Sequence, residues 1–350
     1  MKEAFISPDT EAEIREVPIP VPKAGELLIK VAVSGTNPKD WKVPIFLQNQ
    51  VNSGDDIAGI VEAVGAGVSE FKPGDRVAGM HEIGIAHGSF AEFAITPAST
   101  TFHIPDNVTF EEAVTIPLNG LVAAYGLYHV LRMPAPWSPA GTEKTPFVIH
   151  GAGTAIGALA IKLAKAANIH PIIATAGNSS NFVNGLLDTE KGDALVDYRQ
   201  PHDKLVAGIQ SAIAKAGHGP AWHGLDCATN HDGAPEYKGI LDDALGLQAG
   251  LENSAGRKPL VATVQAGSKF TGHVDGGEIN VMVAHNGGKE ERCLAYTVSR
   301  LFAYGLASGW LTGHPTEVVE GGLGGVGEAL RRLKSEQVFG KKLIIKIGEL

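Results

Sequence analysis

The sequence predicts an α/β protein in which a strand-rich, barrel-like region precedes a doubly wound parallel sheet. Three observations predict this fold class. Short β-prone segments with Gly and Pro turns fill roughly the first hundred residues, strands and helices alternate from Phe147 to Val264, and a glycine turn follows the first of those strands. Short strands with tight turns favour a barrel, whereas alternating strands and helices favour a parallel sheet covered on both faces.

The elements are expected in the following order. Before Pro105 we expect strands, over 26–33, 57–64, 76–78 and 89–95. Helices follow over 110–114 and 118–131, the second with Leu121, Val122, Tyr125 and Tyr128 at helical spacing. After a Pro-rich loop over 133–146, strands are expected over 147–150, 171–174, 194–198, 224–228 and 259–264. Helices over 155–167, 205–216 and 240–247 lie between them, and the tail adds a helix over 329–334 and a strand over 343–347.

The glycine turn carries the first functional signal. Gly151, Gly153 and Gly157 follow the apolar strand 147–150 and open an amphipathic helix, with a spacing one residue longer than G-x-G-x-x-G. Strand, glycine turn and helix form the phosphate-binding half of a dinucleotide fold, because the backbone can approach the pyrophosphate and the helix N-terminus faces it. A tight strand-to-helix connection without a ligand is the alternative interpretation.

The end of the next strand indicates which dinucleotide is bound. The segment 175–181 has no Asp or Glu that could bind the free ribose 2′-hydroxyl of NAD. It has Ser179, Ser180 and Asn181 instead, which suit the extra phosphate of NADP. A Ser/Asn-rich turn that caps the following helix is the alternative.

A second glycine motif, over 322–327, fits G-x-G-x-x-G letter for letter. Val318 and Val319 before it make a poor strand, and only one helix and one strand follow it. We therefore interpret this segment as a glycine-rich loop before a surface helix.

Composition excludes several classes of function. Of the 350 residues, 44% are hydrophobic and 19% charged, and the net charge of −9 disfavours nucleic acid or an anionic membrane as a partner. The two cysteines, Cys227 and Cys293, cannot build a cysteine-based zinc site or a disulfide framework, and they fit a cytoplasmic location. Neither a secretory signal nor a run near about 18 apolar residues is visible.

With these pieces placed, the sequence resembles the medium-chain dehydrogenase/reductase superfamily over nearly its whole length. The resemblance rests on the turn at Gly151 and on the segments 54–59, 64–65, 71–77, 88–92 and 340–343. It implies a GroES-like barrel domain over 1–117, an NADP-binding Rossmann domain over 118–295, and a tail over 296–350 that returns to the barrel.

Within that superfamily the chain looks like the zinc-free quinone oxidoreductase branch. Zinc alcohol dehydrogenases have Cys where Asn37 stands and a His-Glu pair where Asp55 and Asp56 stand, so we expect no metal. His81 and His87 flank a glycine-containing loop, and we expect them to make local hydrogen bonds rather than to bind a metal.

A narrower likeness is to fungal stand-alone enoyl reductases that serve polyketide synthases in trans. It rests on 37–42, the Pro-rich loop, 151–156, 196–199 and 225–227. The resemblance implies that NADPH contacts Lys39, Asp40, Trp41, Lys42, Gly151, Gly153, Thr154, Ala155, Ile156, Ser179, Ser180, Asn181, Tyr198, Val264 and Lys341.

We predict that the protein transfers hydride from NADPH to an activated alkene or a quinone without zinc. A hydrogen-bond donor would stabilise the developing enolate or phenolate, and the candidates are Lys42, Tyr125 and Tyr128. Lys42 could instead only touch the cofactor, and the two tyrosines could be core aromatics. The partner is a small enone or quinone, or an acyl carrier protein if the protein is a trans-acting enoyl reductase. A non-catalytic NADPH sensor, and a monomer or a homodimer, remain open.

Overall fold

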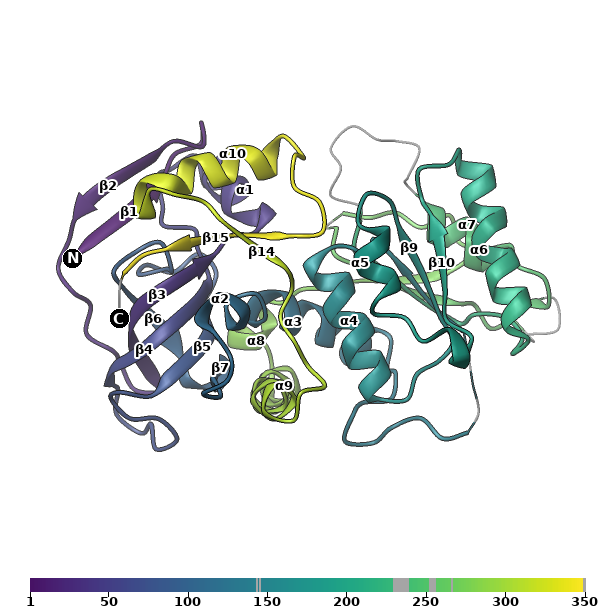
Figure 1. Ribbon diagram of the computed structural model, residues 1–350, viewed down its shortest axis with the longest axis horizontal. Coiled ribbons are helices and arrows are strands. Elements are labelled where there is room, and N and C mark those ends of the chain that lie inside the picture. The colour runs from purple at the N-terminus through teal and green to yellow at the C-terminus, as the bar shows by residue number, and fades with distance from the viewer. Residues whose placement is uncertain (143, 145, 229–238, 252–255, 266, 349–350) are drawn as a thin grey trace. The chain divides into compact units, whose positions relative to one another are not determined.

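The computed structural model describes residues 1–142, 144, 146–228, 239–251, 256–265 and 267–348. The chain forms two compact units (Figure 1). The barrel unit comprises Met1–Leu121 with Val281–Leu350, and the sheet unit comprises Val122–Asn280. The domain boundaries at 117 and 295 stay a prediction. Within the described residues, no helix combines the length and the apolarity needed to cross a membrane.

The barrel unit is built on a seven-stranded sheet with β15 near one edge. Its path is β14 (Thr316–Val318), β15 (Lys342–Lys346), β3 (Glu26–Gly35), β4 (Asp56–Val64), β5 (Arg76–Met80) and β7 (Thr101–His103), and β6 (Phe93–Pro97) also pairs with β3. β15 runs antiparallel to β3, with Ile344 opposite Gly35, so a strand from the end of the chain lies beside one from its beginning. A separate hairpin joins β1 (Lys2–Ile6) and β2 (Ala12–Glu16).

The strand expected over 89–95 is displaced toward the C-terminus. β6 begins only at Phe93, because the preceding residues run beside β1 instead. There the Ala4 N–H donates to Phe90 O at 2.8 Å and the Glu92 N–H donates to Lys2 O at 3.0 Å. The Phe90 carbonyl and the Glu92 N–H are thus hydrogen-bonded to β1 and are not available for pairing with β3.

The helices of the barrel unit include α1, which positions the candidate site. They are α1 (Pro38–Leu47), α2 (Phe110–Ala113), α8 (Val283–Asn286), α9 (Lys289–Ala307) and α10 (Val326–Lys334). The glycine motif over 322–327 follows β14, a strand of only three residues that ends at Val318 and runs parallel to β15. A Cβ on Gly327 would lie 3.4 Å from Ala12 N, so this loop packs against the start of β2.

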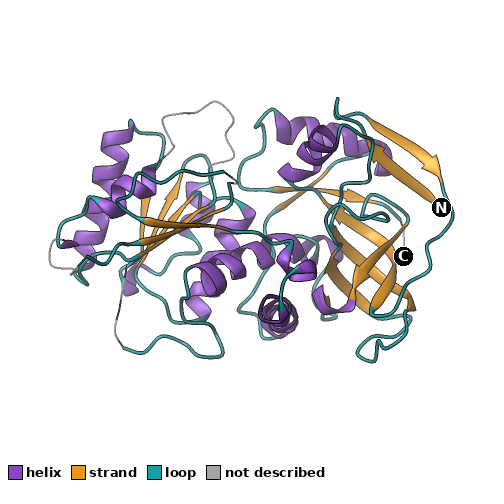
Figure 2. Ribbon diagram, turned by 180° about the vertical axis from the view of Figure 1, so that it is seen from behind, coloured by secondary structure: helices purple, strands orange, loops and turns teal. Residues whose placement is uncertain are grey.

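The sheet unit is a six-stranded sheet whose described pairings are all parallel. Its strands are β8 (Phe147–His150), β9 (Ile172–Ala176), β10 (Ala194–Asp197), β11 (His223–Asp226), β12 (Leu260–Thr263) and β13 (Asp275–Glu278), in the order β10-β9-β8-β11-β12-β13. The helices α4 (Ala155–Ala166), α5 (Ser180–Asn184), α6 (His202–Ala216) and α7 (Ile240–Gly246) connect them. Helices lie on both faces (Figure 2), which is the doubly wound arrangement expected from the sequence.

The helix expected over 118–131 is present, but its second half is a π-helix rather than an α-helix. α3 (Pro117–Ala124) continues as a π-helix over Tyr125–Val130, in which the Leu131 N–H donates to Gly126 O at 3.0 Å. The widened turn presents Gly126 to the sheet, where an added Cβ would lie 2.9 Å from side-chain carbons of Leu225 and Ile279. Apolar spacing does not distinguish such a turn from α-helix over so short a stretch.

Candidate active site and cofactor-binding elements

The glycine turn of the sheet unit brings three backbone segments into close contact. Gly151 has φ +79°, and a Cβ there would lie 2.7 Å from the Cβ of Ala228. A Cβ on Gly153 would lie 1.8 Å from Ser179 Oγ. The positions therefore require glycine, because any side chain would push the turn away from the ends of β9 and β11.

Thr154 closes the turn and begins α4. Its hydroxyl accepts from the Gly157 N–H at 3.0 Å and donates to Gly151 O at 2.9 Å. α4 has 12 residues, and its N-terminus carries the partial positive charge that binds anions. Thr154 thus acts as the N-cap of α4.

The ends of β9 and β10 hold the residues predicted to select NADP. Tyr198 packs across Gly177, where a Cβ would lie 2.8 Å from the tyrosine Cζ. Ser180 Oγ donates to Gly177 O at 2.7 Å, so this hydroxyl orders the turn. The structure thus brings Ser179, Ser180, Asn181 and Tyr198 to the same end of the sheet as the glycine turn, at the carboxyl ends of β8 to β10.

Arg199 also lies at this end, and the sequence reasoning gave it no role. Its guanidinium binds the Asp197 carboxylate at 2.6 Å and donates to Asn178 Oδ1 at 3.1 Å. Hydrogen bonds from Arg199 lower the pKa of Asp197 to about 2. The signal that could have found this residue is its place directly after Tyr198, because a cation at the end of the second or third strand suits a 2′-phosphate.

The end of β11 contributes a buried acid beside the glycine turn. The Cys227 N–H donates to His150 O at 2.9 Å, and Val264, a predicted cofactor residue, donates its N–H to Asp226 O at 3.2 Å. The Asp226 carboxylate accepts from the Ala228 N–H at 3.0 Å, and burial raises its pKa to about 7. Burial also raises the pKa of the Cys227 thiol.

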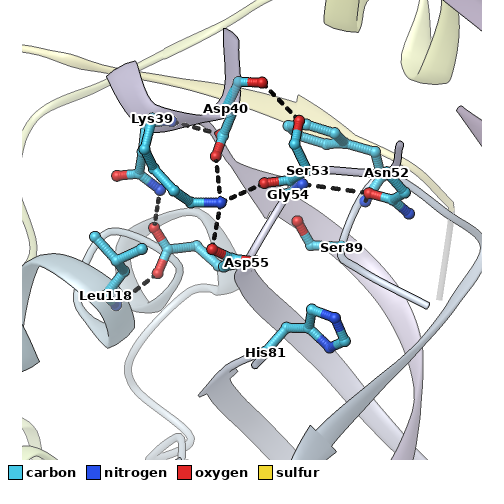
Figure 3. A network of polar contacts seen from close by, with 12 residues as sticks. Lys39, Asp40, Asn52, Ser53, Gly54, Asp55, His81, Ser89 and Leu118 are labelled. Atoms are coloured by element: carbon cyan, nitrogen blue, oxygen red, sulfur yellow. Dashed lines mark hydrogen bonds and ion pairs between the residues drawn. The ribbon is translucent and has the colours of Figure 1, made fainter. Parts of the chain in front are cut away.

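In the barrel unit, the predicted cofactor residues of α1 meet a buried ionic cluster, which we define as Lys39, Asp40, Asp55, Asp56 and Lys342. The Lys39 ammonium contacts Asp40 Oδ1 at 2.8 Å, the carbonyl oxygen of Ser53, and the Asp55 carboxylate (Figure 3). Asp40 also accepts from the Asn37 N–H at 2.7 Å at the start of α1. The buried Asp40 side chain therefore stabilises the start of α1.

Lys342 forms the other half of the buried ionic cluster. Its ammonium donates to Asn37 Oδ1 at 2.7 Å and to Asp56 Oδ2 at 2.8 Å. Asn119 Nδ2 donates to Asn37 Oδ1 at 3.1 Å, and the Leu118 N–H donates to Asp56 Oδ1 at 2.7 Å. Lys342 was missed by the sequence reasoning, which chose the neighbouring Lys341; that residue is exposed and contacts Glu317 at 3.4 Å.

The cluster has three carboxyl groups for two ammonium groups, and this excess affects its protonation. Burial, opposed by the Lys39 charge, raises the pKa of Asp40 to about 7 and that of Asp55 to about 6. Burial alone would lower the pKa of Lys39, but attraction to Asp40 and Asp55 outweighs it and the pKa is raised. Lys39 therefore stays charged.

The residues at the positions of the zinc ligands of alcohol dehydrogenases bind lysine side chains in this protein. Asn37 and Asp56 bind Lys342, and Asp55 binds Lys39. Across the part of the chain that the structure describes, no group of three or more His, Cys, Asp or Glu side chains could hold a metal ion. His81 makes the expected local contacts, with ring nitrogens 2.7 Å from Ile95 O and 3.0 Å from Ile85 O.

The remaining candidates lie in different surroundings. Lys42 Nζ lies 5.2 Å from the ring centroid of Trp41, and Lys334 Nζ lies 5.6 Å from the same centroid. Tyr125 is fully buried in the π-helix. The Tyr128 hydroxyl is buried with no hydrogen-bond partner among the described residues, and burial raises its pKa. Tyr128 therefore stays protonated, and its hydroxyl can donate a hydrogen bond.

Comparisons with known proteins agree with this geometry. Residues 23–106 match the family described as the alcohol dehydrogenase GroES-like domain. The chain is 37% identical over 324 residues to trans-enoyl reductase fsr4 of Gibberella fujikuroi, covering 92% of this chain and 91% of that protein. It is 30% identical over 364 residues to trans-enoyl reductase resD of Aspergillus sclerotiorum, covering 99% and 100%. The crystal structure of an alcohol dehydrogenase superfamily protein from Novosphingobium aromaticivorans shares the fold, with a TM-score of 0.77, 20% identity and coverage of 99% and 100%.

A GroES-like barrel unit combined with a doubly wound parallel sheet defines a medium-chain dehydrogenase/reductase, and the prediction of that fold class is confirmed. Within the superfamily, identity along nearly the whole chain places this protein in the fungal trans-enoyl reductase family, to which it belongs. It is an oxidoreductase of a nicotinamide-dependent family.

Proposed function

We propose that this protein is an NADPH-dependent enoyl reductase that acts in trans on α,β-unsaturated acyl thioesters held by the carrier protein of a polyketide synthase. The observation that carries this proposal is the identity to fungal trans-enoyl reductases over 92% of the chain. The glycine turn supports it, because close approach at Gly151 and Gly153 leaves the N-terminus of α4 ready for a pyrophosphate. A cytosolic location suits the two free cysteines.

The charges near the end of β9 support NADPH rather than NADH as the cofactor. The segment 175–181 has no carboxylate that would bind a free 2′-hydroxyl and repel a phosphate. Arg199, Asn178 and Ser179 lie there instead, and a guanidinium binds phosphate oxygens in a bidentate manner. The bound cofactor would supply a hydride from C4 of its nicotinamide.

The chain's own residues must then stabilise negative charge on the thioester oxygen and deliver a proton to the α-carbon. Tyr128 suits the first task, because its buried hydroxyl keeps its proton and has no partner among the described residues. Lys42 is held against the Trp41 ring at the start of α1 and suits a contact with the cofactor or the acyl oxygen. Tyr128→Phe should lower kcat and leave the KM for NADPH unchanged, and Tyr304→Phe, at an exposed tyrosine of α9, is its matched control.

The deciding experiment measures NADPH oxidation with one enoyl group presented in three forms: on a purified carrier protein, on pantetheine, and as a free enone, with a quinone as a fourth acceptor. We expect kcat/KM to be highest for the carrier-bound form. Equal rates with the carrier and pantetheine forms would remove the carrier protein from the proposal. A rate with the quinone alone would favour the quinone oxidoreductase alternative, and tight binding without turnover would favour an NADPH sensor.

Cofactor selectivity is tested separately. Arg199→Ala should weaken NADPH binding by roughly ten- to a hundredfold, as expected for the loss of one charge-assisted hydrogen bond, and should leave NADH binding nearly unchanged. Titration of each nucleotide by fluorescence measures both constants. Equal losses for the two nucleotides would show that Arg199 does not contact the 2′-phosphate.

A further inference from the structure

We propose that Lys39 is a positioning residue whose ammonium group acts as a built-in cation, fixing the first turn of α1 in the conformation that binds the cofactor. The inference rests on the proposed function, since that turn ends at Trp41 and is followed directly by Lys42, both of them predicted cofactor residues. It adds a role for a side chain that the resemblance assigned only to direct cofactor contact.

The contacts of Lys39 show that its charge is directed inward. An ammonium group has three N–H donors, and here it has three oxygen neighbours, on Asp40, Ser53 and Asp55 (Figure 3). No donor is left for a cofactor phosphate or a thioester oxygen in this arrangement. The side chain is only 23% exposed, which fits a structural cation better than a ligand-binding one.

The three oxygens come from two segments that the ammonium joins. Asp40 belongs to the first turn of α1, whereas Ser53 and Asp55 belong to the segment just before β4. A further bond, from Ser53 Oγ to Asp40 O at 2.7 Å, joins the same two segments. The ion contacts therefore determine where the first turn of α1 lies relative to the sheet of the barrel unit.

Removing the Lys39 ammonium should increase the mobility of the first turn of α1, in addition to lowering the stability of the barrel unit. Asp40 and Asp55 are almost completely buried, and without Lys39 two carboxyl groups would face each other in a site of low polarity. Asp40 also holds the Asn37 N–H at the start of α1. Repulsion at Asp40 is thus transmitted directly to the backbone that precedes Trp41 and Lys42.

Lys342 does not duplicate this role. Its ammonium binds Asn37 and Asp56, and the structure gives it no contact with Asp40 or Asp55. The two lysines therefore stabilise different parts of the buried ionic cluster. Of the two lysines, only Lys39 binds Asp40 and Asp55.

The oxygen set around the Lys39 ammonium also suggests how to replace it. Two carboxylates and a carbonyl accept hydrogen bonds from a small primary ammonium ion, and a bulky quaternary ammonium ion has no N–H to donate. In Lys39→Ala the truncated side chain leaves space for methylammonium beside the same oxygens. Chemical rescue by that ion distinguishes a fixed charge from a generally damaged fold.

The test compares Lys39→Ala with Lys30→Ala, an exposed lysine of β3, with and without methylammonium, and with tetramethylammonium as the ionic-strength control. Hydrogen–deuterium exchange of the α1 peptide is the primary measurement, and NADPH affinity is the second. We expect Lys39→Ala to exchange faster and to bind NADPH about tenfold more weakly, with methylammonium alone restoring part of each. Unchanged exchange and affinity, or rescue equal for the two ions, would overturn the proposal.

The double variant Lys39→Ala/Asp55→Asn removes the cation together with one acid. We expect its exchange rate and its affinity to lie between those of Lys39→Ala and the wild type, and it replaces the single variant should that one not fold. A double variant equal to the wild type in both measurements would show that the bridge does not position the turn. Failure of the wild-type protein to bind NADPH would refute the proposed function instead, and the exchange measurement would still decide this inference.

Discussion

The glycine turn of the sheet unit and the buried ionic cluster of the barrel unit both underlie predicted cofactor contacts, but they are built in opposite ways. The turn uses backbone and small side chains within a few residues, with a hydroxyl cap from Thr154. The cluster uses five charged side chains from three distant segments. Loss of a glycine in the first should damage local geometry, whereas loss of one charge in the second should leave another charge buried and unpaired.

The largest effect is expected in the buried ionic cluster, from Lys342→Met. The substitution keeps most of the side-chain volume but leaves Asp56, which is fully buried, without its ammonium partner. We expect the free energy of unfolding to fall by roughly 3–5 kcal/mol. Urea denaturation measures it, with Lys341→Met, the exposed neighbour, as the control. A loss below about 1 kcal/mol would mean that the cluster tolerates an unpaired acid and does not differ from the glycine turn in this respect.

A lone buried carboxyl group in the sheet unit should also make stability depend on its charge. Asp226 has a pKa raised from 3.8 to about 7 by burial, so the folded state holds the proton more tightly than the unfolded state. Its stabilising effect is complete below about pH 4 and is lost as the pH rises through about 7. Asp226→Asn cannot ionise and should lack this loss, which amounts to roughly 3–4 kcal/mol between the two ends of that range. Parallel pH dependences of the two unfolding free energies would contradict it.

A smaller effect is expected in the glycine turn itself. In Gly153→Ala the new Cβ would overlap Ser179 Oγ, so the turn and the predicted 2′-phosphate segment must move apart. We expect NADPH affinity to fall by roughly tenfold, or about 1.4 kcal/mol. Gly141→Ala is the control, because nothing lies within 4 Å of a Cβ there. Because Ser179 is itself a predicted cofactor residue, the substitution is repeated in a Ser179→Gly background, where it should cost less affinity than in the wild type. An equal cost in both backgrounds would mean that the overlap is not the cause.

The smallest effect is expected for a charge pair at the surface of the barrel unit. Arg331 and Glu11 lie 3.1 Å apart with side chains 46% and 71% exposed, so water screens their attraction. Glu11→Gln should change the unfolding free energy by less than about 0.5 kcal/mol. Thermal or urea unfolding at low and high salt checks it. A change as large as that of Lys342→Met would show that burial is not what separates the two kinds of charge pair.

The difference between these regions also explains how much the sequence could predict. The glycine turn, the strand before it and the helix after it are local, so Gly151, Gly153 and Thr154 could be interpreted from neighbouring residues. The role of Lys342 could not, because its partner Asn37 lies 305 positions away. The alternation of side chains along β15 does not indicate that Lys342, a charged residue, is buried.

Other misses have similar physical reasons. The π-helix over Tyr125–Val130 depends on the close approach of Gly126 to Leu225 and Ile279, which is tertiary packing. Arg199 was passed over because an arginine at a strand end is usually only a solvated charge, and its contact with Asn178 depends on the pairing of β9 and β10. The cofactor and catalytic assignments stay predictions.

The position of β15 has a consequence for synthesis on the ribosome. β15 pairs with β3 and supplies Lys342 to the cluster, so the barrel unit remains incomplete until residues near 346 have left the exit tunnel. The sheet unit is encoded without interruption between Val122 and Asn280 and has all its own strands much earlier. Nascent chains halted before β15 should therefore contain a protease-resistant sheet unit and a barrel segment that is still cleaved.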